Sequence, residues 1–417
     1  MIIFALLGTA RAADTHAVDS EESMAMLLVA LLMIAIAYLL AHFVVDRLQR
    51  RYLFVSGVEY ILLGVGLSFF KIFQHSESFM PAIAFALGWV GILYGLTGDL
   101  RKQRQEENGY DLRLAVMETL VVGIGVGALG SFFFQMISSN SSDALACGAM
   151  LGCSAAAGSS SAVKVISGRY PNIKTALLPT LKGSAQISSI ISIAAFGFLI
   201  CIHHAESSSV SAATWSWITL ILGGGLGILY AAFLVADSSE NSRFLALTGI
   251  ICFASGAAFF LNLSVLAVTL FLGLVIANTR HGQTVLDTMA SAQKPALLIL
   301  LVFAGVLWKP VGLLPGIGIT LGYWSLRTVL KAIGGWLATK GTVLRGDIFR
   351  GHLAQGEVAL AIALSFRLIF DSPAADLAYT AVIISVAINE LIAPRFLRGL
   401  LVDAGDIRQD ISESRGA

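Results

Sequence analysis

Residues 143–166 read DALACGAMLGCSAAAGSSSAVKVI, an apolar stretch of bilayer length whose centre, Gly152–Ser161, consists of small and polar residues. A membrane-spanning helix is normally apolar throughout, because lipid offers no partner to a free backbone amide or carbonyl group. Small polar residues at mid-depth therefore favour one of two structures. The helix is broken and lines a ligand site, or it packs closely against neighbours through Gly, Ala and Ser.

The rest of the chain has a composition typical of a membrane protein. Of its 417 residues, 57% are hydrophobic and only 13% are charged, whereas soluble domains contain about 25% charged residues. The net charge of +1 gives no indication of nucleic-acid binding. No nucleophile–base set and no metal-ligand spacing is present, so the sequence argues against an enzyme and predicts no cofactor. The cysteines lie in apolar stretches and are expected to pack as small hydrophobic residues. They are Cys147, Cys153, Cys201 and Cys252.

Apolar segments of bilayer length predict an all-α polytopic membrane protein with about 13 transmembrane spans. Most are joined by short loops, so the function is expected to lie within or across the bilayer. The spans run approximately over residues 24–45, 53–71, 79–98, 113–136, 143–166, 174–201, 212–236, 243–261, 263–279, 285–308, 311–331, 347–370 and 377–400.

Positive charges follow the odd-numbered spans. Arg47, Arg50 and Arg51 come after span one, and Arg101, Lys102 and Arg104 after span three, whereas loops after even spans carry few. Span eleven is likewise followed by Lys331, Lys340 and Arg345. Because cytoplasmic loops are enriched in Lys and Arg, the N-terminus is predicted outside and the C-terminus inside, in an inner or plasma membrane. Segment 1–23 is then extracytoplasmic, and its Ala10–Ala12 resembles a signal-peptidase site. The tail, 401–417, is cytoplasmic.

A second span is interrupted in the same way. Span twelve carries Gly351 and then Gln355-Gly356-Glu357 at its centre. With the predicted topology, span five runs inward and span twelve runs outward. Two interrupted helices of opposite direction, one in each half of the chain, are typical of a transporter site built from inverted repeats. This pairing favours a binding site over close packing alone.

Four segments resemble the monovalent cation/proton antiporter superfamily, of the sodium/hydrogen exchanger type, and most closely its potassium-efflux branch. They are YGLTGDLR at 94–101, LFLGLVIAN at the start of 270–308, GHLAQGEVALAIAL at 351–364 and NELIAPRFLRGL at 389–400. The resemblance implies an antiporter fold with inverted repeats and two broken helices that cross. It further implies three parts: a dimer bundle (24–98 and 243–308), a linker helix (212–236) and a transport bundle (113–201 and 311–400). It also implies a homodimer and an elevator mechanism.

The chain departs from this family at the ion site. The family carries a Thr-Asp-Pro or Thr-Ser-Pro triplet at the first helix break, and an Asn-Asp or Asp-Asp pair on the next span. Here the triplet position reads Ser159-Ser160-Ser161. Ser189 lies 29 residues after Ser160, at the family's spacing, so the pair position reads Ser188-Ser189. The resemblance therefore implies that serines occupy the place of the acidic pair.

This replacement matters because a serine hydroxyl offers oxygen lone pairs to a cation but does not titrate near neutral pH. We expect the ion to be met by Ser159, Ser160, Ser161, Ser188, Ser189, Gln355 and Glu357. Another acid must then carry the proton, and the candidates are Glu357, beside the break in span twelve, and Glu118 in span four. Carboxylates at this depth are normally kept for function.

Other charges are expected to be structural. A buried Glu118–Lys182 pair is predicted because an unpaired buried charge is so unfavourable, with Lys164 nearby, and Glu390 is predicted to pair with Arg395. Lys182 supports a second interpretation, since it lies two helical turns before Ser189 and shares its face. The two lysines and the serines would then hold an anion.

The leading hypothesis is a monovalent cation:proton antiporter that moves Na⁺ or K⁺ against H⁺. Two alternatives remain open at this point. The same fold could move an anion or an uncoupled cation, or the chain could be a non-transporting sensor or partner subunit that has lost the carboxylate ion site.

Overall fold

A computed structural model describes residues 57–69, 79–99, 109–137, 140–170, 175–204, 210–236, 240–309 and 311–407, with four isolated positions before residue 50. The predicted N-terminal segment 1–23, most of span one and the tail beyond residue 407 lie outside the described residues. Within the described part, every regular element is a helix.

Each predicted span from two to thirteen corresponds to a helix or to two consecutive helical pieces. By length and composition, six of these segments can cross a membrane on their own, α8 and α9 together being one of them. The elements are α3 (Val58–Ser68), α5 (Met80–Leu96), α7 (Tyr110–Ile137), α8 (Ser141–Ala156), α9 (Ser161–Arg169), α10 (Leu177–Ile202), α11 (Ala212–Ala236), α12 (Glu240–Phe260), α13 (Val265–Ala277), α14 (Gly282–Val306), α15 (Leu313–Thr339), the 3₁₀ helix η2 (Ile348–His352), α16 (Glu357–Ile369) and α17 (Pro373–Asp403). The all-α prediction is confirmed.

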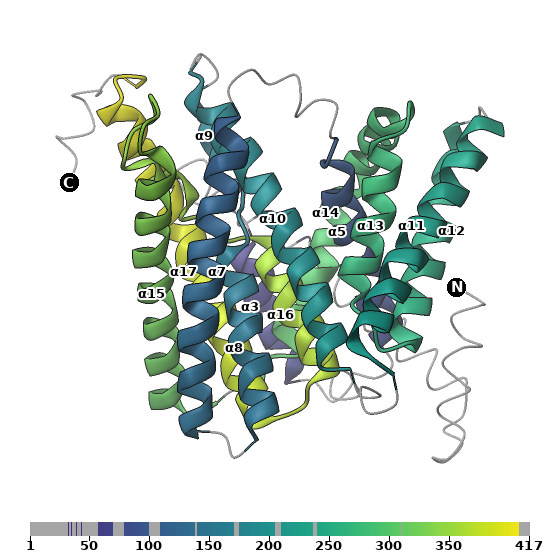
Figure 1. Ribbon diagram of the computed structural model, residues 1–417, viewed down its shortest axis with the longest axis horizontal. Coiled ribbons are helices and arrows are strands. Elements are labelled where there is room, and N and C mark those ends of the chain that lie inside the picture. The colour runs from purple at the N-terminus through teal and green to yellow at the C-terminus, as the bar shows by residue number, and fades with distance from the viewer. Residues whose placement is uncertain are drawn as a thin grey trace.

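The helices pack in two groups (Figure 1). The first, which we call the crossing bundle, comprises α7–α10, η2 and α15–α17. The second, the flanking bundle, comprises α3, α5 and α12–α14. Helix α11 packs on α12 and α13 and also touches α10. The bundles meet where α10 and α16 lie against α5 and α13, so the interface between them runs past the broken span twelve.

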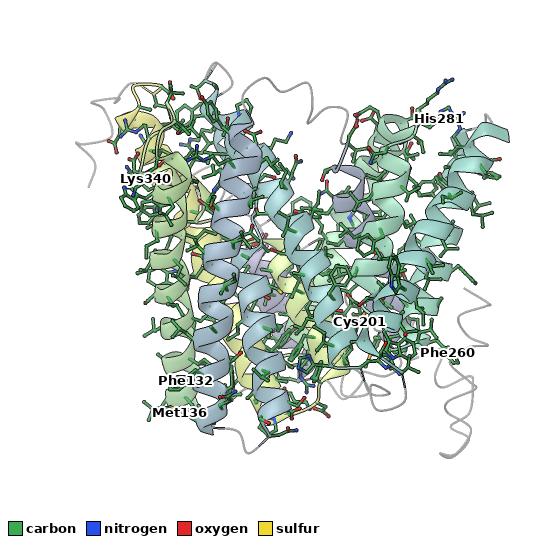
Figure 2. The ribbon with its side chains drawn as sticks, in the orientation of Figure 1. Phe132, Met136, Cys201, Phe260, His281 and Lys340 are labelled. Carbon is green, nitrogen blue, oxygen red and sulfur yellow. The ribbon has the colours of Figure 1, made fainter. Side chains whose placement is uncertain are left out.

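Alternate loops lie at the same end of the molecule. Figure 2 shows His281 and Lys340 at one end, and Phe132, Met136 and Phe260 at the other. His281 follows span nine and Lys340 follows span eleven. The loops for which the sequence predicts a common side therefore do lie together in the fold.

Helices α5 and α13 approach each other through glycines. A methyl group added to Gly273 would lie 3.0 Å from the Cα of Gly95 and 2.5 Å from the carbonyl oxygen of Ile92. No side chain fits between these backbones. Small residues allow such contact where lipid gives no hydrophobic drive for helix association, so this pair forms a rigid centre of the flanking bundle.

Span eleven is longer than predicted. The sequence places its end at residue 331, with Lys331 in an inner loop, whereas α15 continues to Thr339 and only 1% of the Lys331 surface is exposed. The loop assignment of Lys331 is therefore wrong. The residues after it are apolar enough to continue the helix, and the buried ammonium group finds a carboxylate partner, as described below.

Candidate functional site

Both predicted helix breaks are present. Helix α8 ends at Ala156 and α9 begins at Ser161, with non-helical backbone between them. The second break separates η2, which ends at His352, from α16, which begins at Glu357. A methyl group added to Gly356 would lie 3.0 Å from the Cβ of Ser159. The two breaks therefore touch in the interior of the crossing bundle, and a side chain at position 356 would separate them.

Arg327 of α15 holds both breaks. Its side chain is fully buried. Nε donates to the carbonyl oxygen of Ala155 (3.1 Å), Nη1 to that of Leu353 (3.0 Å) and Nη2 to that of Ala354 (3.2 Å). These carbonyls lie where α8 and η2 end, so they have no partner further along their own helix. One guanidinium thus supplies hydrogen-bond donors to the free carbonyls at both helix ends, and its positive charge interacts favourably with the negative ends of the two helix dipoles.

Gln355 links three helices at the second break. Its Nε2 donates to the carbonyl oxygen of Ser154 (3.2 Å) and to the hydroxyl of Tyr323 (2.9 Å). Its Oε1 accepts from Ser385 Oγ (2.9 Å) and Asn389 Nδ2 (3.0 Å). The amide therefore uses both of its donor hydrogens and both acceptor lone pairs. Gln355 lies at the predicted site, but in this conformation it fixes α8, α15 and α17 to the break.

The serine pair of α10 lies against the first break. Ser189 Oγ lies 2.8 Å from the carbonyl oxygen of Gly158 and 2.9 Å from that of Ala185, so its one hydrogen is donated to, or shared between, these two acceptors, and no part of its side chain is exposed. A methyl group added to Gly158 would lie 2.6 Å from Ser188 Oγ. The structure therefore brings residues 158–161 and 188–189 together, as the spacing predicts. Their hydroxyl oxygens retain acceptor lone pairs.

Further hydroxyl groups extend this region. Ser159 Oγ and Ser161 Oγ are 2.9 Å apart, and Ser160 and Ser161 are half-buried. Ser192, one turn after the pair on α10, is 1% exposed, and its Oγ has no hydrogen-bond partner among the described residues. Ser192 is not among the site residues predicted from sequence, although its helical spacing from Ser188 puts it on the same face of α10. A line of hydroxyls thus follows α10 past the break.

Glu357 is the carboxylate nearest the contact between the breaks. It is the first residue of α16 and is half-buried, and its Oε1 accepts a hydrogen bond from the hydroxyl of Tyr94 (2.8 Å). Tyr94 belongs to α5 of the flanking bundle. The free amides at the start of α16 favour a negative charge there. Glu357 therefore lies on the crossing bundle, at its interface with the flanking bundle.

Glu118 does not pair with Lys182. Its Oε2 lies 3.1 Å from Lys331 Nζ and 2.9 Å from His352 Nδ1, and all three side chains are at least 96% buried. Lys182 and Lys164 are both exposed. Leu181 and Ser184, on either side of Lys182 in α10, contact His352, the partner of Glu118, whereas the Lys182 side chain leaves the helix on an exposed face. The predicted Glu118–Lys182 pair is wrong, and Glu118 is committed to other partners.

Glu390 does not pair with Arg395. Glu390 is 4% exposed and its Oε2 has no hydrogen-bond partner among the described residues, whereas Arg395 is exposed. Five residues of helix turn the chain by about 140° beyond a full turn, so the two side chains leave α17 on different faces. The carboxylate instead lies beside Gly57, where an added methyl group would be 2.8 Å from Oε2.

Ion pairs hold both ends of span twelve. At the end near η2, Asp347 binds Arg345, and this hydrogen bond keeps the pKa of Asp347 below its ordinary value. Beyond α16, Asp371 binds Arg367, and that hydrogen bond likewise lowers the pKa of Asp371. Both carboxylates are partly or largely exposed, so water screens these pairs and each stabilises the fold only slightly. Both pairs are local in sequence, so they order the chain at each end of the broken span.

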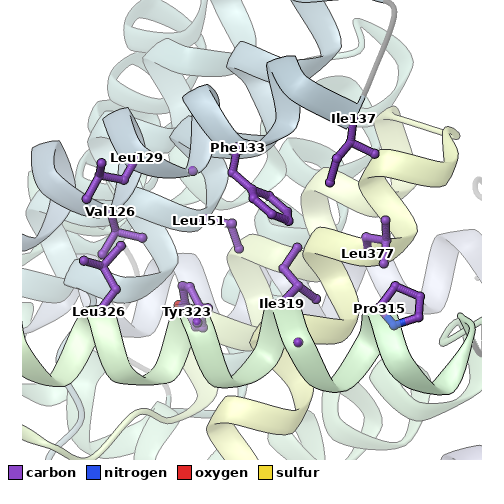
Figure 3. Close-up of a pocket in the computed structure, with 13 residues that line it drawn as sticks. Val126, Leu129, Phe133, Ile137, Leu151, Pro315, Ile319, Tyr323, Leu326 and Leu377 are labelled. Atoms are coloured by element: carbon purple, nitrogen blue, oxygen red, sulfur yellow. The ribbon is translucent and has the colours of Figure 1, made fainter.

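An apolar pocket of about 490 Å³ lies beside the site, between α7, α8, α15 and α17 (Figure 3). Phe133, Ile319 and Leu377 line it, and Tyr323 also faces it. The hydroxyl of Tyr323 accepts from Gln355. Because its lining is almost entirely apolar, this pocket is unsuited to an inorganic ion and is separate from the serine-lined contact between the breaks.

Replacing Lys331 by methionine is expected to lower the free energy of unfolding by about 3 kcal/mol, because a buried carboxylate then loses one of its two cationic partners. Thermal unfolding of the purified protein measures this. The double variant with Glu118→Gln removes both charges and is expected to recover part of the loss. Lys182→Met, at an exposed lysine, is the matched control. Equal stability of Lys331→Met and Lys182→Met would contradict the pairing.

Known structures share this fold. No protein-family profile and no curated protein sequence matches the chain. The sodium proton antiporter MjNhaP1 from Methanocaldococcus jannaschii, solved at pH 8, superposes with a TM-score of 0.61 at 17% sequence identity, over 90% of this chain and 99% of that one. An electron-microscopy map of the same antiporter gives a TM-score of 0.60 at 15% identity, over 90% and 96%. The antiporter fold expected from the sequence motifs is confirmed.

Proposed function

Because the chain has the fold of a sodium/proton antiporter, we propose that it is a membrane transporter exchanging a monovalent cation, Na⁺ or K⁺, for protons. The observation that carries this proposal is Glu357. It is a half-buried carboxylate beside the contact between two broken helices, and it faces the flanking bundle through Tyr94. A carboxylate so placed can bind either a cation or a proton but not both, and this competition couples the two movements.

The ion would be held by oxygen atoms of the crossing bundle. Ser159, Ser188 and Ser189 supply hydroxyl oxygens at the first break, and Glu357 supplies a charge at the second. Rings of neutral oxygens bind partly dehydrated Na⁺ or K⁺, as in channel filters. Serines in place of aspartates leave a single formal negative charge, so we expect weaker cation binding than an acidic pair would give.

The movement would be a displacement of the crossing bundle along the flanking bundle. This elevator arrangement is supported by the position of the breaks, which lie in one bundle and close to its interface with the other. The hydrogen bond from Tyr94 to Glu357 crosses that interface and would break in each cycle. We also infer a homodimer formed through the flanking bundle, with the N-terminus outside and the C-terminus inside.

The anion alternative loses its support. It depended on Lys182 and Lys164 near the serines, and both side chains are exposed. Arg327 cannot replace them, since its guanidinium already donates to Ala155, Leu353 and Ala354. The buried positive charge at the breaks therefore serves the backbone.

Purified protein in liposomes that contain a pH-sensitive dye tests the proposal. Pulses of Na⁺, K⁺ or Li⁺ are expected to move protons, whereas choline is not. Current without a pH change would instead indicate uncoupled cation transport, and dependence on the anion would indicate anion transport. Folded protein that is silent under every gradient would indicate a non-transporting subunit.

A further inference from the structure

His352, a residue that sequence analysis overlooked, lies at the centre of the buried charge cluster. It ends η2 and is 4% exposed. Its Nδ1 is 2.9 Å from Glu118 Oε2, which also accepts from Lys331 Nζ at 3.1 Å. An ionised carboxylate is only an acceptor. Nδ1 of His352 therefore carries a hydrogen and donates it to Glu118.

The second ring nitrogen also faces acceptors. Nε2 is 2.8 Å from Ser184 Oγ and 3.4 Å from the carbonyl oxygen of Leu181. Ser184 has a single hydroxyl hydrogen, and its Oγ lies 2.7 Å from the carbonyl oxygen of Thr180, one turn earlier on α10. When that hydrogen goes to Thr180, only lone pairs of Oγ face the ring. Nε2 then carries a hydrogen too, and His352 is a doubly protonated imidazolium.

Loss of the Nε2 proton requires only one local change. The Ser184 hydroxyl can turn from the Thr180 carbonyl to donate to Nε2, and the ring becomes neutral with its hydrogen on Nδ1. The site thus has a satisfied arrangement in either charge state. Imidazole is also the side chain whose charge ordinarily changes between about pH 5 and 8.

We propose that His352 is a second proton-binding site of the crossing bundle, loaded and unloaded through Ser184. Ser184 stands between His352 and the serine pair, since its own carbonyl oxygen accepts from Ser188 Oγ (2.9 Å). His352 also directly precedes the two carbonyls that Arg327 binds. A cation at the serines is repelled by the imidazolium and admitted when the ring is neutral. This coupling rests on the proposed function, whereas the proton site itself does not.

The surroundings of the ring determine its charge. Helix α7 contributes Glu118, and α15 contributes Lys331 and Arg327. Helix α10 contributes Ser184 and two carbonyl oxygens. Helix α17 presents apolar side chains to η2, and its Asp403 pairs with Arg350 of η2. Among the described residues, Glu118 is the carboxylate that contacts this cluster; it binds Lys331 and, when His352 is protonated, a second cation, with Arg327 close enough to interact electrostatically. Departure of the Nε2 proton reduces this excess of positive charge.

Nitrogen-15 resonances of histidine-labelled, full-length protein test the site. The resonances missing from His352→Gln identify this ring. If His352→Gln does not fold, the ring is identified by the resonances that shift in Ser184→Ala, which perturbs only the Nε2 side. We expect imidazolium at about pH 5, conversion to the Nδ1–H neutral form by about pH 9, and a larger neutral fraction when Na⁺ or K⁺ is added at fixed pH. His281→Gln, at a half-buried histidine in a loop, should leave this behaviour unchanged.

Two results would overturn the proposal. A ring that is neutral even at about pH 5, or one that stays imidazolium to about pH 9, would make His352 a fixed structural partner of Glu118. These results are separable from those for the proposed function. A protein that is silent in liposomes but has a titrating His352 would refute exchange and leave the proton site. Exchange without titration of His352 would refute the second proton site and leave the proposed exchange standing.

Discussion

Replacing Glu357 by glutamine is expected to reduce cation-driven proton movement in liposomes to the level of empty vesicles. Glutamine has nearly the shape of glutamate and can accept the hydrogen bond that Tyr94 donates to Oε1. It has neither the negative charge that attracts the cation nor a site that binds a proton. Because the side chain is half-buried at the first position of α16, the fold should survive. The initial rate of dye response after a Na⁺ or K⁺ pulse is the measurement.

Glu390→Gln provides the matched control for this variant. Glu390 is also a buried carboxylate and interacts electrostatically with Glu357, but it lies on α17 beside Gly57 and not at the contact between the breaks. We expect Glu390→Gln to retain exchange. If Glu357→Gln retained exchange and Glu390→Gln lost it, the cation and the proton would compete at Glu390 and not at the contact between the breaks.

Replacing Arg327 by methionine is expected to have the largest effect on stability. The substitution leaves three carbonyl oxygens, those of Ala155, Leu353 and Ala354, without their donor in a dry interior. Each buried unsatisfied polar group is unfavourable by about 1–3 kcal/mol, so the sum is roughly 3–9 kcal/mol. Folded proteins are stable by only about 5–15 kcal/mol. Thermal unfolding and the yield of monodisperse protein report the loss.

Arg327→Lys is expected to rescue only part of this loss, because a single ammonium on a flexible stem cannot reproduce a planar fork of donors. Arg395→Met is the control, since it removes an exposed arginine from α17. If Arg327→Met unfolded at the temperature of Arg395→Met, the carbonyl ends of α8 and η2 would have other partners. The account of how the breaks are held would then fail.

The breaks could be predicted from sequence because small, polar runs interrupt two spans of opposite direction, one in each half of the chain. The small, polar runs around Ser159 and Gln355 cannot continue as lipid-facing helix, and the structure breaks both spans there. The proximity of Ser189 to the first break also followed from spacing. The breaks depend on residues close together in the chain, and the position of Ser189 follows from the spacing found in a known family.

The partners of the buried charges could not be predicted in this way. Lys182 shares a helix face with Ser189, but helical spacing does not show which part of that face is covered by other helices, and the Lys182 side chain is exposed. Lys331 and His352 reach Glu118 from α15 and η2, which are more than two hundred residues away in sequence. Two charges within one apolar span, Arg327 and Lys331, were the available signal. Because the end of span eleven was predicted at residue 331, Lys331 was assigned to a loop and this signal was missed.

Release of protons on cation binding tests the central claim most directly. Detergent-solubilised protein in weakly buffered solution with a pH dye is mixed with NaCl, KCl or choline chloride. We predict that Na⁺ or K⁺ acidifies the solution, that choline does not, and that Glu357→Gln loses most of the signal. Binding of radiolabelled Na⁺ or K⁺ with no release of protons would contradict competition at this site, as would the absence of any cation binding by folded protein.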